Sequence, residues 1–176
     1  MNGCVFLIGT SHTYQYGAGN AWSKKAPCSP EADEAFRNVL MAAVSTHALR
    51  GIAEEMNEQF LAEAKVTASV PQLIAKQLGL PHAFCEPNRR ERVALGIEQE
   101  NEIRVSARLN GRSEEYVAKA LKEQFEKRES VWLQRVERLN AWPVLFVCGA
   151  NHVSSFSALL AREKVFCEVL HADWQI

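Results

Sequence analysis

The chain has 176 residues, of which 47% are hydrophobic and 23% are charged, and its formal net charge is -1. This balance is typical of a globular protein with a substantial core, and we expect one domain over residues 1–176. Without a basic excess, nucleic-acid binding is not expected. No apolar run approaches the roughly 20 residues of a membrane helix.

The five cysteines form no CxxC pair and match no zinc-site spacing. Cys4, Cys85, Cys148 and Cys167 lie in apolar stretches, where a free thiol behaves as a small hydrophobic group. Only Cys28 lies in a polar loop. We therefore expect reduced thiols and a cytoplasmic protein.

The chain begins with an apolar stretch over 4–8, which predicts a strand that Gly9 ends. A polar, glycine-containing loop over 10–29 follows and is long for a strand-to-helix connection. Ser29 and Pro30 then have the residue types of a helix N-cap and first helical position. The pattern after them predicts an amphipathic helix.

A weaker strand is predicted over 49–53, and a third near 82–85. Between them, Ser69 and Gln72 have the spacing of a capping box at the start of a helix. Gly79 has the residue type that closes such a helix at its C-terminus.

Asn88 is a further candidate N-cap, whereas 98–111 shows no clean period and predicts no element. A long helix is predicted over 113–140. Its apolar stripe is interrupted at Arg128 and Glu129, where helical spacing requires an apolar residue. Either the helix bends there and Glu129 faces water, or the pair points into a functional site.

The most continuous apolar run, 144–148, predicts a central strand, and 165–170 predicts a fifth strand. Strands that alternate with helical patterns are typical of βαβ units. We therefore expect an α/β fold with three layers, a mostly parallel five-stranded sheet and helices on both faces.

Reactive side chains follow every predicted strand. In open parallel sheets, ligands bind beyond the carboxyl ends of the strands, where the loops converge. In strand order, the residues at these ends are His12, then Glu54 and Glu55, then Glu86, then His152, and finally His171 with Asp173.

The two G-x-x-H turns, which carry His12 and His152, are the most specific feature. Two imidazoles with a carboxylate from Glu54 or Glu55 would form a three-ligand site for a divalent metal, with an open position for water. Glu86 and Glu129 are alternative sources of the carboxylate. Without metal, the same groups would act as general base and acid. The alternative is that each histidine only caps a turn or makes a local hydrogen bond.

Other residues are candidates for substrate contacts. Arg89 and Arg92 begin a helix beyond the third strand, where they would bind an anionic group or simply face water. Tyr14 lies in the long first loop with Trp22 and Lys24-Lys25, a loop that is either a lid or an excursion without function. Asn151 precedes His152 in the second turn.

Three of these motifs together resemble the TraB/Tiki superfamily, and more loosely the erythromycin-esterase-like and ChaN-like proteins. They are Gly9-Thr10-Ser11-His12, Arg128-Glu129 and Gly149-Ala150-Asn151-His152. The resemblance implies an α/β fold with a site built from these histidines and acidic residues. Some members are described as metal-dependent proteases, others as esterases, and ChaN-like members as haem binders.

The sequence therefore predicts a small hydrolase, metal-assisted, that acts on a small-molecule or peptide substrate. In it, His12 and His152 serve as ligands or bases, and Arg128 stabilises negative charge. The alternative is a noncatalytic module that binds haem, a nucleotide or another anion at the same edge. A homodimer contact through the long helix and Trp132, Trp142 or Trp174 is compatible with either.

Overall fold

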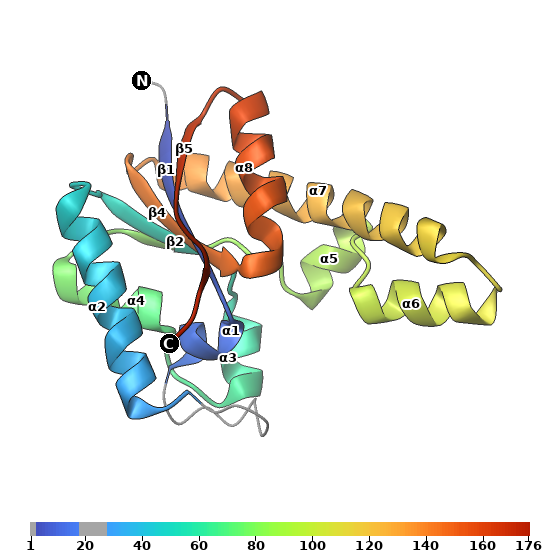
Figure 1. The fold of residues 1–176 in the computed structure, drawn as a ribbon, viewed down its shortest axis with the longest axis horizontal. Helices are drawn as coiled ribbons and strands as arrows, with labels where there is room; N and C mark the ends of the chain where they lie inside the picture. The colour runs from blue at the N-terminus through green and yellow to red at the C-terminus, as the bar shows by residue number, and fades with distance from the viewer. Residues whose placement is uncertain (1–2, 18–27) are drawn as a thin grey trace.

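The computed structural model of the protein describes residues 3–17 and 28–176. Five strands form one sheet in the order β3-β2-β4-β1-β5, and all neighbouring strands are parallel (Figure 1). The strands are β1 (Cys4–Thr10), β2 (Gly51–Glu54), β3 (His82–Phe84), β4 (Val144–Gly149) and β5 (Phe166–Trp174). The predicted three-layer α/β fold is confirmed, and β4 is central and fully buried.

Helices cover both faces of the sheet. The helices are α1 (His12–Tyr16), α2 (Pro30–Thr46), α3 (Glu58–Ala64), α4 (Val70–Leu78), α5 (Arg89–Leu95), α6 (Glu100–Leu109), α7 (Glu114–Leu139) and α8 (Val153–Arg162). A 3-10 turn, η1 (Ala150–His152), joins β4 to α8. Hydrophobic clusters on the two faces show that α2 and α4 cover one and α7 and α8 the other.

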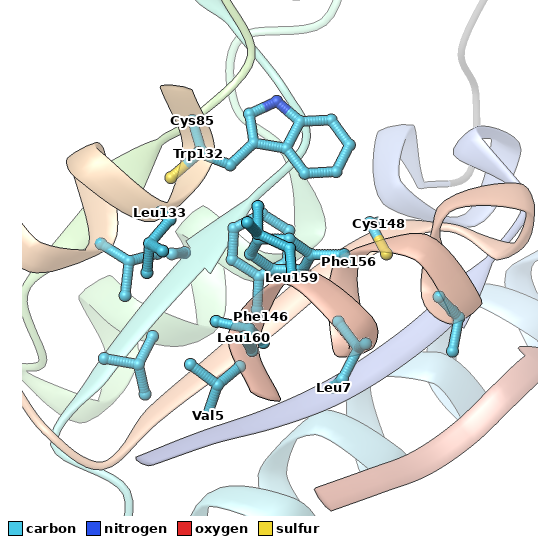
Figure 2. Close-up of a cluster of buried hydrophobic side chains, with 14 residues drawn as sticks. Val5, Leu7, Cys85, Trp132, Leu133, Phe146, Cys148, Phe156, Leu159 and Leu160 are labelled. Atoms are coloured by element: carbon cyan, nitrogen blue, oxygen red, sulfur yellow. The ribbon is translucent and has the colours of Figure 1, made fainter. Parts of the chain in front are cut away.

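The alternation of side chains along β1 divides the core between these faces. Val5 and Leu7 point toward α7 and α8, whereas Phe6 and Ile8 point toward α2 and α4. Figure 2 shows the first of the two clusters, in which residues of β1, β4, α7 and α8 meet. Its largest fully buried side chain is Trp132.

Side-chain caps fix where the helices begin. Ser29, Ser69 and Asn88 each accept a backbone N–H in the first turn, as their residue types predict. Gly79 ends α4 in the left-handed conformation, also as predicted. The capping box expected at Ser69 is incomplete, because the buried Oε1 of Gln72 has no hydrogen-bond partner.

Three boundaries differ from the sequence prediction. β1 continues through Gly9 to Thr10, so Gly9 is a strand residue and not a turn. β2 begins and ends later than predicted. β5 continues to Trp174, which places His171 and Asp173 inside the strand, because pairing with β1 extends through Thr10.

The segment without a clean sequence period contains α6, which packs against the first half of α7. This helical arm extends away from the sheet (Figure 1). Its small core consists of Ile103, Ala107 and Val117. A two-helix arm needs only one narrow apolar stripe on each helix, which explains the weak pattern.

The aromatic residues considered for a lid or a dimer contact are partly used inside the fold. Tyr14 lies in α1 and packs edge-on against Trp174, with ring centroids 4.9 Å apart. Trp132 and Trp174 are both buried, whereas Trp142 is half-buried. Trp22 and Lys24-Lys25 lie outside the described residues. In residues 3–17 and 28–176, no helix has the length and apolar character to cross a membrane.

Gly9 is required by crowding. A Cβ atom there would lie 2.2 Å from the carbonyl oxygen of Ala172 and 2.3 Å from a methyl group of Val153. We expect Gly9→Ala to lower the free energy of unfolding by about 3 kcal/mol, because backbone must move to admit the methyl group. Gly111→Ala is the control. A Cβ atom at Gly111 would have open space, and φ there is +61°. This substitution should therefore lower the free energy of unfolding by only about 1 kcal/mol. Urea unfolding measures both, and equal losses would contradict the steric explanation.

Candidate functional site

The strand order brings together the residues that follow β1, β2 and β4, because these three strands are neighbours. They supply His12, Glu55 and His152 to one pocket of about 480 Å³ at the carboxyl edge of the sheet. The α6–α7 arm forms the opposite wall. The pocket is lined by Thr10, Ser11, His12, Glu55, Arg92, Glu98, Gln99, Glu100, Leu121, Gln124, Phe125, Arg128, Gly149, Ala150, Asn151, His152 and Asp173.

Glu55 is the centre of this pocket. Its Oε1 atom lies 2.6 Å from Nη2 of Arg128, 3.7 Å from Nε2 of His12 and 3.6 Å from Nε2 of His152. Its Oε2 atom accepts a hydrogen bond of 2.8 Å from the backbone N–H of Gly149. One buried carboxylate therefore contacts both G-x-x-H segments.

The environment keeps Glu55 ionised. Burial alone would raise the pKa of this carboxyl group. The facing His12, Arg128 and His152 side chains and the Gly149 amide outweigh burial and lower the pKa to about 2. The carboxylate is thus a permanent negative charge at the base of the pocket.

Arg128 joins Glu55 to Glu86. Its Nε and Nη2 atoms lie 3.2 and 3.0 Å from Oε2 of Glu86, which also accepts a hydrogen bond from Nε1 of Trp132. Burial raises the pKa of the Glu86 carboxyl group, although Arg128 opposes this. Oε1 of Glu86 has no hydrogen bond, and Arg92 lies 3.9 Å from it. The guanidinium group of Arg128 is therefore held between two buried carboxyl groups.

His152 is oriented by Glu129, the next residue of α7. Nδ1 of His152 lies 2.9 Å from Oε1 of Glu129, an atom that also accepts a hydrogen bond from the Ser155 hydroxyl group. Nε2 of His152 lies 3.3 Å from Nη1 of Arg128. When Nε2 accepts from this guanidinium group, which can only donate, the proton of the neutral ring lies on Nδ1 and faces Glu129.

His12 lies at the mouth of the pocket, with 47% of its side chain exposed. Its Nδ1 atom lies 3.2 Å from Oε1 of Gln15, one turn later in α1. With Nδ1 donating to this oxygen, Nε2 carries the free lone pair and faces Glu55. Ser11 caps α1 and so fixes the start of the helix that carries this ring.

Glu54 is not part of the pocket, although it precedes Glu55 in the chain. Successive residues of a strand point to opposite faces, and Glu54 therefore faces α4. Its Oε1 accepts a hydrogen bond from Ser69 and lies 2.8 Å from Nε2 of His82. The structure separates the two carboxylates that the sequence proposed as alternative metal ligands.

Some of the other residues that the sequence proposed for the site lie at the pocket, and some do not. Arg92, Asn151 and the pair Arg128-Glu129 lie at the pocket or directly behind it. Arg89 does not, because it is exposed and lies 3.5 Å from Glu63. Tyr14 is absent from the pocket lining.

Two supporting residues were missed in the sequence. Gln15 follows His12 by three positions, and Ser155 follows His152 by three. This i, i+3 spacing, which places side chains on one helical face, was the available signal.

The four residues predicted as metal ligands lie in two places: Glu54 contacts Ser69 and His82, whereas His12, Glu55 and His152 line the pocket. Across residues 3–17 and 28–176, no three His, Cys, Asp or Glu side chains are grouped to hold an ion. The lone pairs of Glu55 and His152 instead face the Arg128 guanidinium group. A metal ion would have to displace this fixed cation.

The charges of the pocket favour a neutral or cationic ligand. Its lining includes four carboxyl groups, from Glu55, Glu98, Glu100 and Asp173, but only two guanidinium groups, from Arg92 and Arg128. Both guanidinium groups also face the buried Glu86. The field of the pocket is therefore unfavourable for an anion.

The pKa of Glu55 predicts an acid-sensitive contribution to stability. Because this pKa is lower in the folded protein than the ordinary value of 4.5, the stabilisation is present above pH 4.5 and is lost as pH falls toward 2. We expect a loss of about 3 kcal/mol, measured by urea unfolding at several pH values.

Glu55→Gln should remove this part of the pH dependence, whereas exposed Glu115→Gln should keep it. An unchanged slope in Glu55→Gln would show that Glu55 is not the group responsible. The contribution of Glu86 to stability has the opposite pH dependence. Because burial raises the pKa of its carboxyl group, this contribution is lost as pH rises through that pKa.

Comparison with known proteins identifies no relative for this arrangement: no family model, curated protein or solved structure matches the chain.

Proposed function

We propose that the protein is a small hydrolase that cleaves an uncharged or cationic ester or amide in the pocket at the carboxyl ends of β1, β2 and β4. The observation that carries this proposal is the convergence of two imidazole Nε2 atoms on Oε1 of Glu55, at 3.7 and 3.6 Å. Convergent histidines around a buried, ionised carboxylate are the groups that acid–base hydrolysis requires.

His12 is the general base in this proposal. Its half-exposed ring can meet a water molecule, and Nε2 has the lone pair that accepts a proton. As the water oxygen bonds to the substrate carbonyl carbon, one water proton passes to Nε2. The carboxylate of Glu55 stabilises the imidazolium ion that forms.

The second half of the reaction returns this proton. The bond between the carbonyl carbon and the leaving oxygen or nitrogen breaks, and the His12 imidazolium donates its proton to the leaving atom. The products are a carboxylic acid and an alcohol or amine, and His12 is again neutral.

Arg128 and His152 supply the fixed electrostatic environment. Arg128 contacts both Glu55 and Glu86, and its positive charge reduces the repulsion between Glu55 and the negative charge that develops on the carbonyl oxygen in the transition state. Glu129 holds His152, which in turn contacts Arg128. No step passes through a metal ion, because Arg128 already places a positive charge against Glu55 and His152.

The alternative of a haem- or nucleotide-binding module is less favoured. Haem propionates and phosphates are anionic, and carboxyl groups outnumber guanidinium groups around the pocket. Arg89, proposed for such a ligand, lies outside the pocket with Glu63.

Paired carboxylate variants test the proposal. With p-nitrophenyl acetate as probe, we expect His12→Ala and Glu55→Gln each to lower kcat/KM about a hundredfold or more. Glu54→Gln is the matched control. It alters the neighbouring carboxylate on the other face of the sheet and should lower stability while leaving kcat/KM within about twofold.

Thermal unfolding of each variant separates loss of fold from loss of chemistry. Wild-type protein without esterase or amidase activity would overturn the proposal, as would equal effects of Glu54→Gln and Glu55→Gln in folded protein. Near-stoichiometric zinc or manganese in wild type that is lost in His12→Ala/His152→Ala would contradict the metal-free site.

A further inference from the structure

A second cavity lies beside the polar pocket, between α7 and α8. Its volume is about 620 Å³. We call it the α7–α8 groove, and it is lined by side chains of α7 between Ala118 and Glu129, by Asn151, and by side chains of α8 between Ser154 and Arg162.

The groove and the polar pocket share a wall. Leu121, Phe125 and Asn151 line both cavities. Leu121 and Phe125 lie one turn apart on α7 and are only half-buried, so apolar surface remains uncovered between the cavities. A ligand with one end in each cavity would therefore pass over these three residues.

The shared wall also contacts His152, which faces Glu55 and Arg128 in the polar pocket. The ring of Phe125 lies 4.0 Å, centroid to centroid, from the ring of His152. Glu129, which contacts Nδ1 of His152, and Ser155, which donates a hydrogen bond to Glu129, both line the groove. Apolar material in the groove would therefore exclude water from the hydrogen bonds that orient His152.

We propose that the α7–α8 groove binds the apolar chain of the substrate while its carbonyl group lies at His12 and Glu55. This inference rests on the proposed hydrolase and names its substrate class: esters or amides with a medium-length aliphatic or aromatic acyl group. The apolar side chains Leu121, Phe125 and Leu159 supply the binding surface.

Acyl chain length tests the proposal. For p-nitrophenyl acetate, butyrate and octanoate below their aggregation limits, kcat/KM is compared after division by the uncatalysed rate. Full burial of one methylene is equivalent to about fourfold in affinity, and even partial burial should give at least a tenfold rise from acetate to octanoate.

Ala158→Trp fills the groove without altering any residue that lines the polar pocket. We expect it to abolish the preference for octanoate and leave acetate hydrolysis within about twofold. Ala161→Trp is the matched control, because Ala161 is exposed on the same helix and lines neither cavity. It should keep the wild-type preference.

A binding measurement separates failure of this inference from failure of the hydrolase. The neutral fluorescent probe N-phenyl-1-naphthylamine should bind saturably to wild type and Ala161→Trp, but at least tenfold more weakly to Ala158→Trp. If no ester is hydrolysed but this binding pattern holds, the hydrolase is overturned and the groove remains an apolar binding site.

Two results would overturn the groove as a subsite. One is active wild-type enzyme whose corrected kcat/KM for octanoate is no higher than that for acetate. The other is probe binding that Ala158→Trp and Ala161→Trp change equally.

Discussion

The site depends on one buried interaction, the guanidinium group of Arg128 between the carboxyl groups of Glu55 and Glu86. Removing any of these charges from water costs several kcal/mol, so they remain buried only because they satisfy one another. The interaction joins the middle of α7 to the ends of β2 and β3. It thereby sets the distance between the sheet edge and the arm, and with it the width of the pocket. Loss of Arg128 would leave two facing carboxyl groups without their shared cation, a larger penalty than loss of either carboxylate.

This interaction explains the break in the α7 sequence pattern. Arg128 and Glu129 occupy positions where the stripe requires apolar residues, and both side chains point toward the sheet edge. The helix does not bend outward to solvate Glu129, which is only 1% exposed. Phe125 and Trp132, on either side of the pair, cover His152 with ring centroids 4.0 and 4.8 Å away. The same helix therefore stabilises the core through its apolar residues and orients the site through the charged pair between them.

Much of the fold follows from sequence pattern, because each strand and cap has a local signal. Ser29, Asn88 and Gly79 fix helix ends through their own backbone contacts, and β4 is recognisable as a fully apolar run. The site is harder to predict because it depends on strand order. His12, Glu55 and His152 meet only because β4 lies between β2 and β1, which no local pattern specifies. The choice between Glu54 and Glu55 depends on where β2 ends, and the predicted boundary was too early to assign their faces.

The α6–α7 arm depends on the rest of the fold for its stability. An α6–α7 hairpin with a core as small as Ile103, Ala107 and Val117 has little stability of its own and must rely on the first half of α7 being continuous with the buried second half. Yet this arm provides Leu121, Gln124 and Phe125 to the pocket wall. Glu55 is thus held at the sheet edge, whereas the apolar wall belongs to a helical arm with a small core. The positions of His12 and Glu55 therefore follow from β1 and β2, whereas those of Leu121 and Phe125 depend on α7 continuing from the core into the arm.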